Sequence, residues 1–164
     1  NDPRLKAYAD VDEANSAIGV AIAVGSLRND IVELLTAIQN DLFDVGADLS
    51  RPLSDAGADE ALRITPEYVE RLEAACDTYN NELEPLRSFI LPGGTSGAAH
   101  LHLARTVVRR AERSTWGAID MYHGGMNQVA ATYLNRLSDL LFILARVANK
   151  NQGDVLWQPG RNHS

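Results

Sequence analysis

The residues with the clearest chemical potential lie between positions 105 and 113, which hold four arginines and a glutamate. On a helix, four of these side chains share one face within roughly 100°, because an α-helix turns once every 3.6 residues: Arg105, Arg109, Glu112 and Arg113. Arg110 points elsewhere. A guanidinium group pairs with phosphate oxygens through two parallel hydrogen bonds, so such a face suits a polyphosphate, and Glu112 could orient an arginine or accept from a ribose hydroxyl. The competing interpretation is a solvated charged face with ion pairs four residues apart.

A second polar group follows in the segment Asn-Arg-Leu-Ser-Asp at 135–139. Asn135, Asp139 and Arg146 fall on one stripe of a helix, opposite its leucine seam. The Asn135 amide could hydrogen-bond a ligand, and the Asp139 carboxylate could bind an arginine of the preceding helix. An ordinary exposed polar face explains the same spacing and is favoured when this stripe is taken by itself.

Asp12 shares a stripe of the first predicted helix with Ser16, Gly19 and Ala23, whose small size allows another helix to approach closely. A carboxylate that faces a helix rather than water needs a cationic partner, for which Arg105 is the candidate. The alternative is a solvent-exposed acid.

A short apolar run at 89–91 ends in Pro92-Gly93-Gly94. Proline and paired glycines cannot continue a helix, so this segment is predicted to be a shaped loop. Phe89 could form one wall of a pocket for a flat ligand, or it could anchor the loop in the core, and the sequence leaves both open.

Several kinds of site are absent from the sequence. His100 and His102 are two residues apart and do not share a helix face, and Glu-x-x-His, Cys-x-x-Cys, His-Glu-x-x-His and Gly-rich nucleotide motifs do not occur. We therefore predict no protein-bound metal. Cys76 is predicted to be a buried apolar residue rather than a nucleophile.

Apolar residues recur at helical spacing in five stretches, separated by proline and glycine. The predicted helices are Lys6–Ser26, a helix capped by Asn29 or Asp30 that reaches Leu49, a third capped by Thr65 with Pro66 at its first position, a fourth capped by Thr95 or Ser96 that reaches Trp116, and Gln128–Asn149. The fifth helix carries a seam of Tyr133, Leu137, Leu141, Leu144 and Ala148. Between the second and third helices, Arg51–Ile64 is a predicted loop. The fold class is an all-α bundle of five helices, ferritin-like in outline, with residues 1–164 as one domain.

Composition narrows the partners. The net charge of −7 over 164 residues argues against broad binding of nucleic acid or anionic membranes, although a local basic pocket is compatible with it. The single cysteine favours a reducing compartment, so we predict a cytoplasmic protein, and the absence of a run of about 18 apolar residues predicts no membrane span.

Five segments, in this order, resemble the ATP-dependent corrinoid adenosyltransferases of the trimeric helix-bundle kind, the family of the propanediol-utilisation (PduO) and human methylmalonic-aciduria enzymes: 8–16, 38–49, 89–94, 105–113 and 134–142. The resemblance covers nearly the whole chain. It implies transfer of the 5′-deoxyadenosyl group of ATP to the cobalt of a cob(I)alamin-type corrinoid, with Mg²⁺, in a homotrimer whose active sites lie between subunits. A flavoprotein reductase and an adenosylcobalamin-dependent mutase are the further partners that we associate with this activity.

The resemblance also implies roles for single residues. The expected ATP contacts are Arg109, Arg110, Glu112, Arg113, Asn135 and Asp139. Arg105 would pair with Asp12 across the subunit boundary, and Phe89 would cover the lower face of the corrin and keep the lower axial base off cobalt.

One departure is that the family's Thr- and Gly-rich phosphate-binding segment near the N-terminus has no match here, so that segment is expected to be missing from this sequence. Three alternative functions compete with this one. They are a non-catalytic adenosylcobalamin carrier or chaperone, a structural bundle without a ligand, and an RNA-binding bundle, which the acidic charge and lack of interleaved aromatics disfavour.

Overall fold

The structure is a computed structural model that describes residues 1–54, 57 and 60–163, so the predicted loop Arg51–Ile64 lies partly outside the described residues. In the described part, five helices follow one another: α1 (Pro3–Val24), α2 (Asn29–Ser50), α3 (Pro66–Asn80), α4 (Ser96–Met121) and α5 (Gln128–Ala148). The described residues form no strand beyond one isolated bridge between Ile90 and Leu156. The predicted all-α class with five helices is confirmed.

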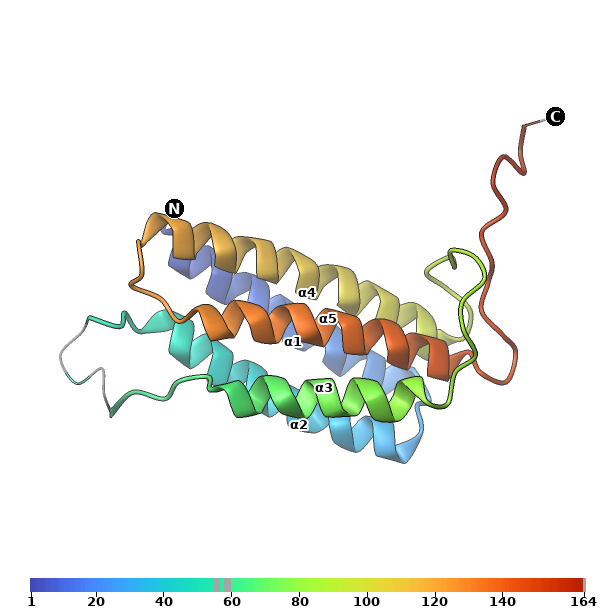
Figure 1. The fold of residues 1–164 in the computed structure, drawn as a ribbon, viewed down its shortest axis with the longest axis horizontal. Helices are drawn as coiled ribbons and strands as arrows, with labels where there is room; N and C mark the ends of the chain where they lie inside the picture. The colour runs from blue at the N-terminus through green and yellow to red at the C-terminus, as the bar shows by residue number, and fades with distance from the viewer. Residues whose placement is uncertain (55–56, 58–59, 164) are drawn as a thin grey trace.

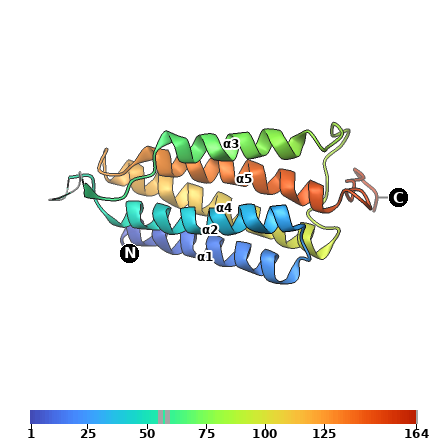
Figure 2. The same cartoon turned by 90° about the horizontal axis from the view of Figure 1, so that it is seen from below.

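The helices run side by side along the long axis of the molecule (Figures 1 and 2). α5 packs between α4 and α3, and α1 packs between α4 and α2. The predicted seam of α5 faces the core, since Tyr133, Leu137, Leu141 and Leu144 are fully buried. Burial of four large side chains from one helix explains why α5 occupies the middle of the bundle.

Two of the predicted helices were too short, one at its start and the other at its end. α1 begins at Pro3 rather than Lys6, because the Asp2 side chain accepts a hydrogen bond from Arg4 N at 2.9 Å and caps the first turn. α4 continues past Trp116 to Met121, until the turn that begins at Tyr122.

The predicted cap of the second helix is wrong. The capping residue of α2 is Arg28, and no side chain caps its first turn. Asp30 is used elsewhere: its Oδ2 accepts from Arg28 Nη2 at 2.8 Å and from the Tyr79 hydroxyl at 2.9 Å. Of the two candidates for the fourth helix, Thr95 is the cap, since its hydroxyl accepts from Ala98 N at 3.1 Å.

A buried carboxylate fixes one end of the bundle. Asp48, almost fully buried near the end of α2, accepts from Arg63 Nη1, Ile64 N and Asn127 Nδ2, each at 2.7 Å. Asn127 also caps α5. Asp48 therefore holds the ends of α2 and α5 and the connection to α3 together. Within the described part of the chain, none of the helices combines the length and apolarity needed to cross a bilayer.

Candidate functional site

A cavity of about 830 Å³ opens where α4, α5, the loop before α4 and the C-terminal tail meet. Its walls contain two arginines of α4 and several aromatic side chains, and the lining includes Phe89, Arg105, Arg109, Phe142 and Trp157. The structure thus brings together three residues predicted from the sequence: Phe89, Arg105 and Arg109. A hollow with one cationic and one aromatic wall suits a flat ligand that carries, or lies beside, an anion.

Arg105 brings an uncompensated charge to this cavity. Its guanidinium carbon lies 5.9 Å from the centre of the Phe142 ring, and its Nε is buried without a hydrogen-bond partner. Burial lowers the pKa of Arg105, and the neighbouring charge of Arg109 lowers it further. Among the described residues, no carboxylate forms an ion pair with Arg105. Arg105 is half-buried, and a partly desolvated cation without a counter-ion is unfavourable, so this site favours an incoming anion.

Phe89 is an exposed wall and not a core anchor. Its side chain is 77% exposed, which rules out the core interpretation. The ring meets Trp157 edge to face, with centroids 5.7 Å apart and planes inclined at 67°. Exposure of an apolar ring to water at the mouth of a cavity is unfavourable. A flat apolar ligand that covers the ring lowers the free energy.

Glu112 and Asn135 connect α4 to α5, and neither of them lines the cavity. Asn135 Nδ2 donates to Glu112 Oε1 at 3.1 Å, and Asn135 Oδ1 accepts from Arg136 Nη1 at 2.8 Å. Arg136 Nη1 also lies 3.4 Å from Asp139 Oδ2. The predicted bond between Asp139 and an arginine of the fourth helix is therefore wrong, because the cation that reaches Asp139 belongs to its own helix.

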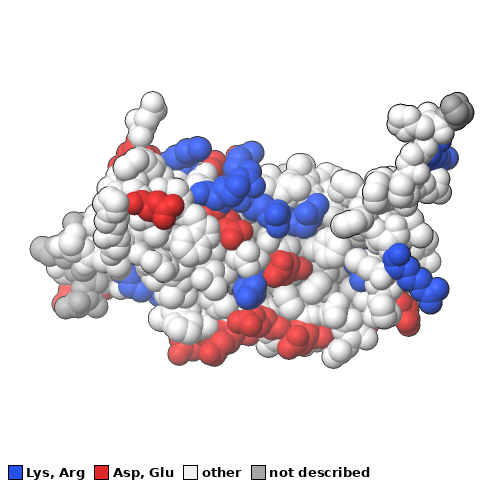
Figure 3. Space-filling view, turned by 45° about the horizontal axis from the view of Figure 1, so that its top comes forward, with Lys and Arg blue, Asp and Glu red and all other residues white. Residues whose placement is uncertain are grey.

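Arg110 and Arg113 line a second hollow of about 670 Å³ against the start of α1, together with Lys6. As predicted, Arg110 points away from Arg105, and it pairs with Glu13 and, at 3.7 Å, with Asp10 of α1. The predicted single arginine face is thus divided between two hollows, since Arg105 and Arg109 line the first. Figure 3 shows several basic side chains gathered in the upper middle of this face with acidic side chains beside them, and a row of acidic side chains along the lower edge.

Comparison with known proteins identifies the family. The family model for cobalamin adenosyltransferase matches residues 1–148. The chain belongs to the cobalamin adenosyltransferase family. It is 58% identical over 159 residues to the corrinoid adenosyltransferase of Mycobacterium tuberculosis, covering 97% of this chain and 82% of that protein. It is 40% identical over 150 residues to the Bacillus subtilis corrinoid adenosyltransferase, covering 92% and 76%.

Solved structures of the same family share the fold. A variant of the PduO-type ATP:corrinoid adenosyltransferase from Lactobacillus reuteri, complexed with cobalamin and ATP, superposes with a TM-score of 0.86 at 38% identity and covers 96% of this chain and 87% of that one. A second variant, complexed with ATP, gives a TM-score of 0.84 at 38% identity, with coverage of 96% and 89%.

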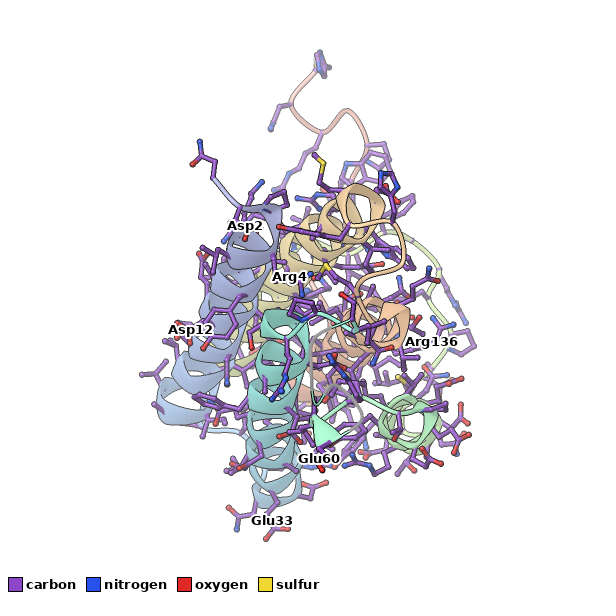
Figure 4. All side chains as sticks on the ribbon, turned by 90° about the vertical axis from the view of Figure 1, so that its left-hand side faces the viewer. Asp2, Arg4, Asp12, Glu33, Glu60 and Arg136 are labelled. Carbon is purple, nitrogen blue, oxygen red and sulfur yellow. The ribbon has the colours of Figure 1, made fainter. Side chains whose placement is uncertain are left out.

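In this member of the cobalamin adenosyltransferase family, Asp12 lies on the outer side of α1, away from Arg136 (Figure 4). It is exposed and borders a shallow hollow with Tyr8 and Phe43. The small-residue stripe of α1 was predicted to face another helix, but within one chain Asp12, Ser16 and Ala23 are exposed. The Arg105–Asp12 pair is not formed inside the chain, and its formation between subunits stays a prediction.

Two site residues of this adenosyltransferase were missed in the sequence. His102 is buried against the Phe142 ring, with centroids 6.0 Å apart, and neither ring nitrogen has a hydrogen-bond partner. Burial, followed by the charge of Arg105, lowers the pKa of His102, and Asp154 opposes this shift. Its position three residues before Arg105 was the available signal, because residues three apart share a helix face.

Asn149 is the other missed residue. It is 1% exposed at the end of α5, where its Oδ1 accepts from Thr95 N at 2.9 Å and its Nδ2 donates to Gly93 O at 2.8 Å. Gly94 has φ +115°, and a Cβ there would lie 2.3 Å from Asn149 Oδ1. Only glycine fits this close approach, so Asn149 and Gly94 together fix the loop that carries Phe89.

The described residues offer neither a metal site nor an activated thiol. Among the described residues, no three His, Cys, Asp or Glu side chains gather in a way that could hold a metal ion. Cys76 is only half-buried, so the prediction of a buried residue is wrong in that respect. Burial still raises the pKa of its thiol to about 11, which disfavours the thiolate that a nucleophile needs.

Proposed function

We propose that this chain transfers the 5′-deoxyadenosyl group of ATP to the cobalt of a reduced corrinoid, releasing triphosphate. The observation that carries the proposal is the cavity in which Phe89 faces Arg105 and Arg109. It offers a flat apolar wall for a macrocycle and unneutralised cations for a nucleotide in one place. Family membership and the ligands of the Lactobacillus reuteri structures support the same activity.

The arginines of α4 bind the nucleotide in this proposal. The triphosphate would lie along α4, from Arg109 in the first hollow to Arg113 and Arg110 in the second, where Arg110 would exchange Glu13 for phosphate oxygens. Its charge increases on the leaving oxygen as the C5′–O bond breaks. Glu112 and Asn135, already hydrogen-bonded to each other, orient the nucleoside. The role of Asp139 is indirect, because Arg136 links it to Asn135.

The chemistry requires no protein nucleophile. Co(I) supplies the electron pair of the new Co–C5′ bond, and triphosphate leaves with the electrons of the broken C5′–O bond. The contribution of the chain is to hold the two substrates in line and to exclude water. Phe89 fills the place of the lower axial base with an apolar ring, and removal of that ligand makes Co(II) easier to reduce.

The complete site in this proposal lies between subunits of a homotrimer. α1 and α2 expose apolar side chains that a partner subunit would cover: Leu5, Tyr8, Val20, Val24 and Phe43. Asp12 lies beside this surface, and Arg105 of a neighbouring subunit would neutralise it. Among the described residues of one chain, neither Arg105 nor Asp12 forms an ion pair, and between subunits each would neutralise the charge of the other.

Further components of the proposal follow from the substrates. Mg²⁺ accompanies ATP, since Mg²⁺ in nucleotide sites is held largely by phosphate oxygens and water with one or two carboxylates. A flavoprotein reductase supplies the electron, and an adenosylcobalamin-dependent mutase receives the product. We place the protein in the cytoplasm, on the same cysteine argument as above.

The test is an absorbance assay with cobalamin, ATP and a strong reductant. Catalysis predicts conversion of the Co(I) spectrum to that of adenosylcobalamin only when protein and ATP are both present. A carrier would bind added adenosylcobalamin without forming it, and a bundle without a ligand would change neither spectrum. Either of those two results would contradict the proposal.

A further inference from the structure

The loop that carries Phe89 is paired with the C-terminal tail. Two backbone hydrogen bonds join them: Leu91 N donates to Val155 O at 2.7 Å, and Trp157 N donates to Phe89 O at 2.9 Å. The pairing is antiparallel. The backbone of the loop is therefore held to the backbone of the tail by the same kind of hydrogen bonds that hold a two-stranded sheet.

This pairing places two aromatic rings on the same side. Ile90 lies opposite Leu156, so Phe89 and Trp157 are also directly opposite each other, and opposite residues project to the same face. Their rings meet edge to face at 5.7 Å, and both line the cavity. Phe89 is 77% exposed, and Trp157 is the aromatic side chain that its ring contacts.

The tail itself is fastened to the bundle just before Trp157. Asp154 Oδ2 accepts from Arg146 Nε of α5 at 3.0 Å, and the two side chains are 13% and 11% exposed. Asn149 Nδ2 lies 3.4 Å from Asp154 Oδ1, and Asn149 also binds Gly93 O. Both paired segments are therefore held at the end of α5, the loop through Gly93 and the tail through Asp154.

We propose that Trp157 is a positioning residue that holds the ring of Phe89 at the angle at which it covers the corrin. This inference rests on the proposed function and adds a residue to it. A phenylalanine ring on an exposed loop has several rotamers of similar energy. An edge-to-face neighbour favours one of them, so the ring is arranged before the ligand arrives.

The chain offers a matched control for the test. Leu156 is the neighbouring tail residue, is 53% exposed, and does not line the cavity, whereas Trp157 is 46% exposed. The variants are Trp157→Ala, Trp157→Phe and Leu156→Ala in the full chain. The measurements are the rate of adenosylcobalamin formation from Co(II) cobalamin with ATP and a reduced flavin, the absorbance spectrum of bound Co(II) cobalamin, and ATP affinity by calorimetry.

Trp157→Ala should slow the reaction from Co(II) about fivefold, the factor that corresponds to roughly 1 kcal/mol for an edge-to-face pair. It should also shift bound Co(II) cobalamin toward the spectrum with its lower base attached, and leave ATP affinity unchanged. Trp157→Phe should restore most of the rate, and Leu156→Ala should match the wild type. Equal losses in Trp157→Ala and Leu156→Ala would overturn the inference, because the effect would then belong to the tail and not to the ring.

A double-variant comparison separates this inference from the proposed function. If Trp157 acts through Phe89, Trp157→Ala causes no further loss in a Phe89→Ala background. The same fivefold loss in both backgrounds overturns the inference while the proposed function stands. A wild-type protein that forms no adenosylcobalamin even with pre-formed Co(I) contradicts the proposed function itself.

Discussion

Asn135 Nδ2 donates a hydrogen bond to Glu112 Oε1 across 3.1 Å, and this contact joins α5 to α4 between Arg109 and Arg113. Arg136 binds the other end of the same amide at 2.8 Å, so both amide atoms of Asn135 are engaged. The carboxylate of Glu112 therefore has a fixed direction. It stands between two arginines that are proposed to bind triphosphate, so a fixed carboxylate is available beside the nucleotide.

Arg109→Ala should weaken ATP binding by at least about tenfold, because a hydrogen bond to a charged group contributes roughly 1.5–3 kcal/mol. Titration calorimetry measures it directly. Arg71→Ala is the control, since it removes the same charge from an exposed position on α3. Similar losses in both variants would mean that net charge, not contact with Arg109, determines the affinity.

Asp12→Asn should weaken trimer assembly or corrinoid binding if Asp12 neutralises Arg105 of a neighbouring subunit. Sedimentation and cobalamin titration provide the two readouts. The sharper test exchanges the charges: Asp12→Arg and Arg105→Asp each lose assembly, and the double variant recovers part of it. No recovery in the double variant, with folded single variants, would contradict the ion pair.

The helices could be predicted because their signals are local. Periodic apolar residues and a leucine seam identify α5, and proline with paired glycines marks the loop at 89–94. The ends were less accessible, since capping depends on partners. Asp30 has the right residue type for a cap, yet Arg28 and Tyr79 use its carboxylate. The sequence does not reveal this competition, because Tyr79 is distant in the chain.

The sequence predicts site residues only where a single local segment, a helix face or a loop, holds them. Arg105 and Arg109 follow from helical spacing, and Phe89 from its loop. Trp157 could not be found, because a polar tail shows no pattern that would bring it back to Phe89. His102 was set aside for lack of a metal-ligand partner, whereas its position depends on burial against α5.

His102 should make the fold less stable in mild acid. Its pKa in the folded protein lies below its ordinary value of 6.5, so the unfolded chain binds the proton more readily. Stability is therefore unaffected well above pH 6.5 and falls as the pH decreases through 6.5 toward the folded pKa. Urea unfolding of the wild type and His102→Phe at several pH values measures this. The variant should lose less stability on acidification.

A matched histidine completes that test. His163 lies in the exposed tail, so His163→Gln is the control for the loss of a histidine as such. Identical slopes for the wild type and His102→Phe would mean that His102 does not titrate differently on folding.

Asp48→Asn should destabilise the fold by about 3 kcal/mol, since breaking a buried ion pair leaves its partner uncompensated. The three donors Arg63, Ile64 and Asn127 all bind this carboxylate at 2.7 Å, and an amide in its place would turn an N–H group toward one of them. Asp44→Asn is the control on the same helix, because Asp44 is only half-buried and accepts from the Tyr68 hydroxyl at 2.9 Å. The urea midpoint should fall far more for Asp48→Asn than for Asp44→Asn. Equal shifts would show that the ends of α2 and α5 are held by packing and not by this carboxylate.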